Sequence, residues 1–173
     1  AKSMTADIVC FDLEDSVPEN EKNNARNLIK NALKSRSEYR PAVYVRTNSP
    51  ITGKITKDLE SVIQKRIDGI VVPKVNNTKE LKKIESTLSK IEKKRKIKPI
   101  QIIPSIESAE GVVNCYEISS MSKRVCAVVF GVFDLLNDMG IEYTKQPEGA
   151  KYARAKIALD AKAADIASID AIW

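Results

Sequence analysis

The stretch Ile100-Gln-Ile-Ile-Pro-Ser-Ile-Glu107-Ser-Ala-Glu-Gly111 decides the fold that we predict for this chain. Its apolar residues predict a buried strand with a turn at Pro104, and Ser108 is suited to cap a following helix. Glu107 is therefore predicted at the carboxyl end of a strand, where ligands bind in parallel α/β sheets and barrels. Asp134 follows the next apolar run in the same way. Two such acids, in a chain without histidine, indicate a metal site with oxygen ligands.

The composition is that of an ordinary soluble globular protein. Of the 173 residues, 43% are hydrophobic and 30% are charged, so we expect one domain over residues 1–173. We find no signal peptide and no apolar run near the ~20 residues that a membrane span needs. The three cysteines, Cys10, Cys115 and Cys126, have no metal or redox spacing and fit core thiols. A cytoplasmic protein without a membrane partner is expected.

The net charge of +6 comes largely from the lysines between residues 79 and 98. Leu81, Ile84, Leu88 and Ile91 keep a helical apolar spacing there, which predicts a helix whose lysines face water. A nucleic-acid surface would need interleaved aromatic residues or a known motif, and neither occurs, so no nucleic-acid partner is expected. An alternative that the sequence leaves open is that some of these lysines contact the phosphates of an anionic cofactor.

Short apolar runs alternate with helical patterns along the whole chain, which predicts a parallel sheet flanked by helices. A doubly wound sheet and a (β/α)8 barrel both fit. No glycine-rich phosphate loop is present, which counts against a nucleotide-binding sheet. Polar residues end nearly every strand, and a barrel gathers such ends in one ring, so we predict a TIM barrel. The expected strands are 7–13, 42–46, 69–74, 100–106, 126–131 and 169–173; the expected helices are 19–33, 56–66, 79–98, 108–120, 135–139 and 149–164.

The predicted strand ends suggest a chemistry. Glu107 and Asp134 are suitable ligands for Mg²⁺, which would leave positions for a chelating 2-oxo or 2-hydroxy acid. Arg46 is suited to bind the carboxylate of that acid with its guanidinium fork. Alternatively, Glu107 forms a cap or an ion pair, Asp134 starts the helix after Gly131, and Arg46 pairs with an acidic cluster.

That acidic cluster is Asp12, Glu14 and Asp15, which follow the first strand. Three free carboxylates in one small site would raise one another's pKa. Lys74 and Arg46 are therefore expected to neutralise some of them, unless the cluster is a polar turn that faces water. With no histidine to act as a base, we expect no serine or cysteine nucleophile.

Seven motifs together carry a family resemblance. In chain order they are Asp12-Leu-Glu-Asp15-Ser-Val, Val45-Arg46-Thr-Asn48, Val72-Pro-Lys74, Ile103-Pro-Ser-Ile-Glu107-Ser-Ala-Glu-Gly111, Phe130-Gly-Val-Phe-Asp134-Leu, Tyr152-Ala-Arg154 and Ile169-Asp-Ala-Ile-Trp173. The ordered set resembles the citrate lyase beta subunit family of the aldolase/citrate lyase superfamily. The resemblance implies a Mg²⁺-dependent carbon–carbon lyase on a TIM barrel. Its substrate would be a coenzyme A thioester such as citryl-CoA or malyl-CoA, cleaved to acetyl-CoA and a 2-oxo acid.

The resemblance also assigns residues. The family's metal-binding Glu and Asp match Glu107 and Asp134, and its substrate-binding Arg matches Arg46. Glu14 and Asp15 match acidic residues that line the site, and with Lys74 they are the expected catalytic residues. The resemblance further implies a homo-oligomer, a trimer or larger, in which a neighbouring subunit supplies the base from a carboxylate near its C-terminus.

The chain departs from the family pattern at both ends. It lacks the first strand with its Arg-Ser pair and the last strand with its helical extension, so about six of eight βα units are expected. A fragment, a natural truncation covered by partners and a degenerate enzyme are the three explanations. We expect the metal pair to persist and lyase turnover to be impaired. A non-catalytic metal- or ligand-binding subunit, or a thioesterase on the same scaffold, is the alternative.

Overall fold

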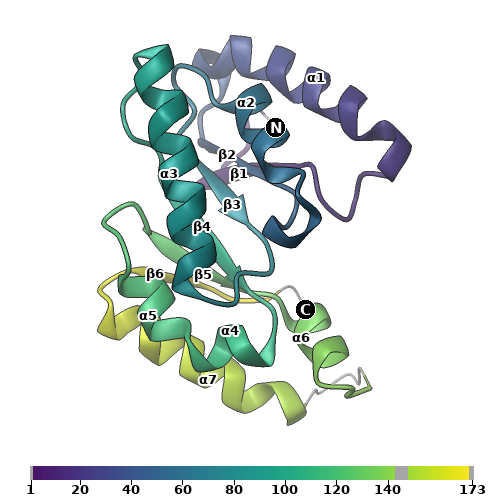
Figure 1. The fold of residues 1–173 in the computed structure, drawn as a ribbon, viewed down its shortest axis with the longest axis vertical. Helices are drawn as coiled ribbons and strands as arrows, with labels where there is room; N and C mark the ends of the chain where they lie inside the picture. The colour runs from purple at the N-terminus through teal and green to yellow at the C-terminus, as the bar shows by residue number, and fades with distance from the viewer. Residues whose placement is uncertain (1, 143–147, 172–173) are drawn as a thin grey trace. The chain divides into compact units, whose positions relative to one another are not determined.

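The computed structural model describes residues 2–142 and 148–171, which form two compact units. Unit 1 consists of residues 1–72 and 84–101, and unit 2 of residues 73–83 and 102–173. Within each unit, parallel strands alternate with helices along the chain (Figure 1). The structure therefore confirms the α/β class, and its six strands are consistent with an incomplete (β/α)8 barrel.

Unit 1 is built on three strands, β1 (Ile8–Asp12), β2 (Ala42–Arg46) and β3 (Gly69–Val72). They lie parallel and in chain order, with Asp12 paired to Arg46 in register. The connections are η1 (Glu19–Glu21), α1 (Lys22–Ala32), η2 (Leu33–Glu38), η3 (Pro50–Thr52) and α2 (Ile55–Val62). The fully buried core of this unit includes Val43, Val45, Leu59, Ile70 and Val72.

Helix α3 (Thr78–Arg95) has the amphipathic character that its sequence predicts. Its apolar stripe is buried, while its lysines are exposed. Asn77 Oδ1 accepts from the Glu80 N–H at 3.2 Å and Glu80 accepts from the Asn76 N–H at 2.9 Å, which fixes the start of the helix. None of the helices in the described ranges combines the length and hydropathy that a bilayer crossing demands.

Unit 2 contains β4 (Gln101–Ile106, of which residues 102–106 belong to this unit), β5 (Ala127–Phe130) and β6 (Ala167–Ile169). These strands are also parallel and in chain order. Four helices belong to the unit, α4 (Ala109–Val113), α5 (Cys115–Ser120), α6 (Val132–Asp138) and α7 (Glu148–Ala163). Helix α7 packs on β5, β6 and α5 through small buried residues, Ala150, Ala153 and Ala161, as its alanine-rich sequence predicts.

The expectation of a turn at Pro104 is wrong, because β4 continues through it. Proline lacks the N–H that a strand ladder needs, so the ladder must be interrupted there. Ile102 pairs with Val125, and Ser105 pairs with Val129. Between these pairs β4 has two residues and the opposing segment has three, so the opposing segment has a bulge opposite Pro104. The bulge lies where the ladder lacks the hydrogen bond that proline cannot donate.

Several element boundaries differ from expectation. The helix predicted over 108–120 is divided at Asn114 into α4 and α5, and α6 begins at Val132, three residues early. Helix α2 ends at Val62 because the next residue, Ile63, has an extended backbone with ψ of 104°. Strand β6 ends at Ile169, where the predicted strand 169–173 was to begin, and residues 172–173 lie outside the described part of the chain.

Candidate functional site

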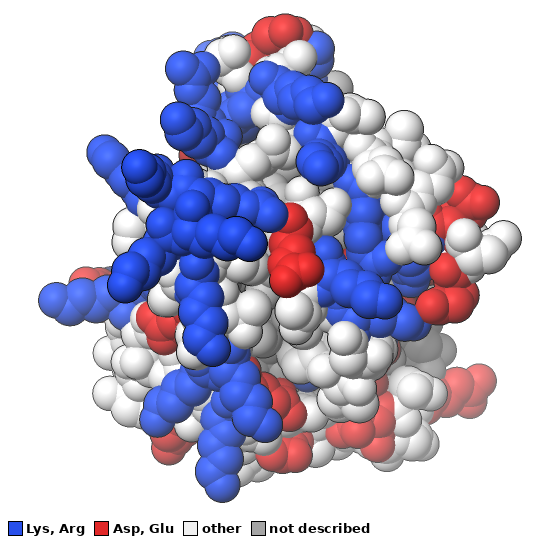
Figure 2. All heavy atoms as spheres, turned by 45° about the horizontal axis from the view of Figure 1, so that its top comes forward, with Lys and Arg blue, Asp and Glu red and all other residues white. Residues whose placement is uncertain are grey.

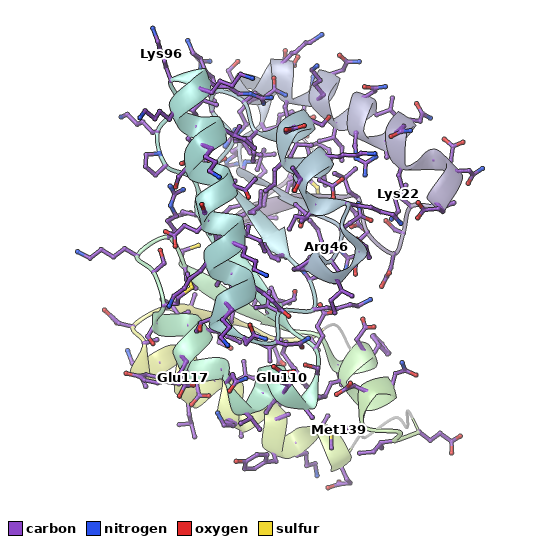
Figure 3. All side chains as sticks on the ribbon, in the orientation of Figure 1. Lys22, Arg46, Lys96, Glu110, Glu117 and Met139 are labelled. Carbon is purple, nitrogen blue, oxygen red and sulfur yellow. The ribbon has the colours of Figure 1, made fainter. Side chains whose placement is uncertain are left out.

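In unit 1, Arg46 lies at the end of β2 (Figure 3). It binds two residues of the acidic cluster, Asp12 and Glu14. Its Nε and Nη2 donate to the two carboxylate oxygens of Asp12, at 2.8 and 2.6 Å. Its Nη1 lies 3.3 Å from Oε2 of Glu14, which is buried. Asp15 is exposed to solvent. The alternative in which Arg46 pairs with the cluster is therefore what the structure shows.

Asp12 is the centre of this arrangement. It also accepts hydrogen bonds from the Glu14 N–H at 2.8 Å and from the Ser16 hydroxyl. Burial opposes ionisation of Asp12, but these hydrogen bonds and the Arg46 guanidinium outweigh it. Together they hold the pKa of the Asp12 carboxyl well below its ordinary range. Asp12 is therefore a carboxylate at any physiological pH.

Buried polar side chains fix the loops that follow β1 and β2. The ammonium group of Lys22 donates to the carbonyl oxygens of Leu13 and Glu14, at 2.7 and 2.6 Å. In α2, one carboxylate oxygen of Asp58 accepts a hydrogen bond from Nε of Arg26 at 2.7 Å. Its other oxygen accepts the backbone N–H of Asn48 at 2.7 Å and the side-chain amide at 2.8 Å. The loops beside Glu14 and Arg46 are thus fixed by buried charges.

In unit 2, Glu107 follows β4 directly and its side chain is buried. Gly131, the residue after β5, makes room for it: a Cβ at this position would lie 2.3 Å from Glu107 Cγ and 2.8 Å from its carboxyl carbon. The absence of a side chain at Gly131 is therefore a steric requirement of the Glu107 position. Three residues later, Asp134 lies in the first turn of α6 and is partly exposed. The β5–α6 turn thus contacts Glu107 and carries Asp134.

Lys74 joins this group from the loop after β3. Its ammonium group lies 3.3 Å from Oδ1 of Asp134. The backbone of Lys74 has a φ of 55°, in the left-handed region that non-glycine residues seldom adopt. Such strain is retained when the surroundings fix the residue, and it is commonest at functional sites. The Lys74–Asp134 pair was not predicted, since Lys74 was expected to neutralise the cluster after β1.

Further hydrogen bonds tie the segments of unit 2 together at the β4–α4 junction. Ser108 Oγ caps α4 by accepting the Gly111 N–H at 3.0 Å, and it donates to Asn76 Oδ1 at 2.5 Å. Asp138, the last residue of α6, accepts the Ala109 N–H at 2.8 Å. The loop that carries Lys74 and the helix that carries Asp134 are therefore both bonded to the residues that follow Glu107.

The structure thus brings the predicted site residues together in two groups. Asp12, Glu14 and Arg46 meet in unit 1, and Glu107, Asp134 and Lys74 lie at successive strand ends in unit 2. The sequence did not single out Gly131, Asn76 or Asp138, because one glycine or polar residue in a loop gives no periodic signal. Burial raises the pKa of the Cys115 thiol to about 11, so this cysteine is no nucleophile at neutral pH.

The donor set of Glu107 and Asp134 fits a hard divalent cation. In the described ranges, no group of three or more His, Cys, Asp or Glu side chains is arranged to hold a metal. A cation here would take these two carboxylates and fill its other positions with water and substrate oxygens. Mg²⁺ commonly binds in this way, whereas Zn²⁺ prefers three or four nitrogen or sulfur ligands. Gly131, which leaves room for the Glu107 carboxylate, supports the same fit.

Sequence and structure comparisons place the chain among known proteins. Citrate lyase subunit beta of Leuconostoc mesenteroides subsp. cremoris is 34% identical over 172 residues, which cover 97% of this chain and 56% of that protein. Mitochondrial citramalyl-CoA lyase of Rattus norvegicus is 33% identical over 182 residues, which cover 99% of this chain and 54% of that protein. Among solved structures, the chain is similar to a citrate lyase beta subunit from M. tuberculosis complexed with oxaloacetate and magnesium. The TM-score is 0.78 at 25% sequence identity, and the match covers 97% of this chain and 70% of that one.

The chain spans about half the length of the curated relatives that it matches. All of it, residues 1–173, matches one family description. The strand-end acids and the ordered motifs agree with that match, and the chain belongs to the HpcH/HpaI aldolase/citrate lyase family.

Proposed function

We propose that this chain forms the metal-binding part of a Mg²⁺-dependent carbon–carbon lyase. The substrate would be a 3-hydroxyacyl-CoA thioester of the citryl-CoA or malyl-CoA type, and the products would be acetyl-CoA and a 2-oxo acid. One observation carries the proposal: Glu107 is held against Gly131, and the same turn places Asp134 at the next strand end. Support comes from relatives named as lyases and from a structural relative complexed with magnesium and oxaloacetate.

The reaction sets out what the site must do. A base removes the proton of the substrate hydroxyl, the adjacent C–C bond breaks as this oxygen becomes the carbonyl oxygen of the 2-oxo acid, and the acetyl-CoA enolate takes up a proton. A bound Mg²⁺ supplies stabilisation for negative charge on the substrate oxygens. In this chain, Glu107 and Asp134 would hold the ion. Lys74, beside Asp134, is placed to balance anionic charge there.

Arg46 is our proposed ligand for the carboxylate of the acid, and it would share its guanidinium with Asp12 and Glu14. Those two acids hold the guanidinium in one orientation, which favours a fixed substrate geometry. Glu14 and the exposed Asp15 remain our candidates for proton transfer within the chain.

The base in the family pattern would come from a neighbouring subunit. We therefore propose a cytoplasmic homo-oligomer, a trimer or larger, whose small-molecule partners are acyl-CoA and 2-oxo acids. The second candidate is a subunit that binds metal and acid but turns over only within a larger complex.

Ligand-dependent thermal stability tests the metal site. We expect Mg²⁺ with oxaloacetate to raise the melting temperature of the full chain by several degrees, since a ligand at 100 times its Kd adds about 2.7 kcal/mol. Glu107→Gln and Asp134→Asn should lose the shift. Glu110→Gln is the matched control, because Glu110 is an exposed carboxylate on α4 that bonds Asn77 (Figure 3). A shift retained by both site variants would contradict the proposed metal site.

A turnover assay separates the two candidate functions. Release of acetyl-CoA from citryl-CoA or malyl-CoA is measured with and without Mg²⁺. Metal-dependent release that Glu107→Gln abolishes supports the lyase. A ligand-dependent rise in melting temperature without turnover supports the binding subunit. Release of free CoA in place of acetyl-CoA would identify a thioesterase and contradict both.

A further inference from the structure

Asp138 closes helix α6 and forms a hydrogen bond outside that helix. Its carboxylate accepts the backbone N–H of Ala109, the first residue of α4, at 2.8 Å. Ala109 lies two residues after Glu107 in the sequence. The bond therefore connects the end of α6 to the backbone that carries a proposed metal ligand.

Asp138 lies on the same side of α6 as Asp134. Residues four apart lie on one face of a helix, so Asp138 and Asp134 project from the same side of α6. Because Asp138 reaches the β4–α4 junction, that side faces the segment that Glu107 begins. The bond therefore constrains the side of α6 that also carries Asp134.

Apolar packing sets the rotation of α6 about its axis only coarsely. Helix α6 has seven residues, and its buried members are Val132, Leu135 and Leu136. Their burial turns one side of α6 toward the core, but apolar contacts are non-directional and still allow small rotations of a short helix. A charge-assisted hydrogen bond depends on distance and angle and restricts that rotation.

We propose that Asp138 is a positioning residue, which orients Asp134 so that its carboxylate and that of Glu107 can bind the same cation. The inference rests on the proposed metal site and adds to it a residue outside the ligand pair. Asp138 is exposed, so water competes for its hydrogen bond and the effect on affinity is moderate. Loss of the bond should weaken cation binding about fivefold, which is the equivalent of one ordinary hydrogen bond.

The test measures the affinity of the full chain for Mn²⁺, used as a paramagnetic probe without substrate. Asp138→Ala removes both the charge and the acceptor, whereas Asp138→Asn removes the charge and keeps an acceptor oxygen. Glu117→Gln is the charge control, because Glu117 is an exposed carboxylate on α5. We expect a loss of about fivefold for Asp138→Ala and less than about twofold for the other two variants.

A second readout needs no metal. Exchange of the Ala109 amide should be faster in metal-free Asp138→Ala than in wild type, and close to wild type in Asp138→Asn. Wild-type affinity in Asp138→Ala would overturn the inference and leave the metal site standing. An equal loss in Asp138→Asn would overturn it too, since charge alone would then explain the effect. Failure of the wild type to bind Mn²⁺ would overturn the metal site and the inference with it.

Discussion

At the scale of single residues, Gly131 has the strictest steric requirement in unit 2. Its backbone conformation, with φ at −101°, is open to any residue, so the requirement does not come from the backbone. It comes from Glu107, whose Cγ would lie 2.3 Å from an added Cβ. One methyl group is thus enough to displace a proposed metal ligand.

Gly131→Ala should destabilise the chain by about 1–3 kcal/mol, because a methyl group is forced into filled space. It should also remove the Mg²⁺-dependent rise in melting temperature. Gly140→Ala is the matched control. Gly140 has a φ of 65° with no atom within 4 Å of an added Cβ, so alanine there costs backbone strain of about 1–2 kcal/mol. Metal binding that survives in Gly131→Ala but fails in Gly140→Ala would contradict this explanation.

The sequence predicted some site residues and missed others for identifiable reasons. The positions of Glu107 and Asp134 after strands could be predicted because each follows a buried apolar run, and their role as metal ligands stays a prediction. The partner of Lys74 could not be found, since the sequence does not state which strand-end charges meet. Asp138 was also beyond reach, because its role depends on a contact with a backbone N–H 29 residues away.

At the scale of elements, an ion pair between Asp12 and Arg46 connects the ends of β1 and β2. Asp12 and Arg46 are register partners in parallel strands, and their side chains form a paired hydrogen bond beyond the backbone ladder. The pKa of Asp12 is lowered in the folded chain. The ionised form therefore stabilises the fold at any pH above the ordinary aspartate value of about 3.9.

Asp12→Asn should lower the free energy of unfolding at pH 7 by about 1–3 kcal/mol, since a charged hydrogen-bond acceptor is lost. As the pH falls below about 3.9, unfolded Asp12 takes up a proton before folded Asp12 does, so the wild type loses this advantage. Urea unfolding at pH 7, 4 and 3 should show the two proteins converging. Asp7→Asn, at an exposed residue before β1, should show no such convergence. A gap that widens in acid would contradict the ionised pair.

The order and type of the main elements could be read from the sequence, and the exceptions have local causes. Alternating apolar runs and helical stripes predicted β1 to β5, whereas the sixth strand was expected over 169–173 and lies at Ala167–Ile169. The bulge opposite Pro104 was missed, because it lies in the neighbouring segment and the sequence of β4 does not encode it. The division at Asn114 was missed because the apolar spacing continues across it.

At the scale of the whole molecule, the positive charge is concentrated. Residues 90–98 hold six Lys or Arg and one acidic residue, an excess of five charges in a chain whose net charge is +6. Glu92, that acidic residue, is buried and accepts the Ile100 N–H at 2.9 Å. Figure 2 shows Lys and Arg side chains gathered on one face, over α3. Lys96, just past the end of α3, is exposed.

This surface should bind polyanions weakly and without specificity. We expect retention of duplex DNA at about 50 mM salt and none at about 200 mM, since such binding comes from counterion release. Lys93→Glu with Lys94→Glu should abolish the retention, while Lys151→Glu, on α7, should leave it. Retention at high salt with a preference for one sequence would contradict the expectation that nucleic acid is not a partner.

The Lys74–Asp134 ion pair sets an order of events. An ammonium group 3.3 Å from Asp134 already balances the charge of that carboxylate, so the chain can fold without a metal ion. A divalent cation that binds the Asp134 oxygen beside Lys74 would displace the ammonium group, which would then be available to an anionic acid. We therefore expect ordered binding at the proposed site, with the cation first and the acid second.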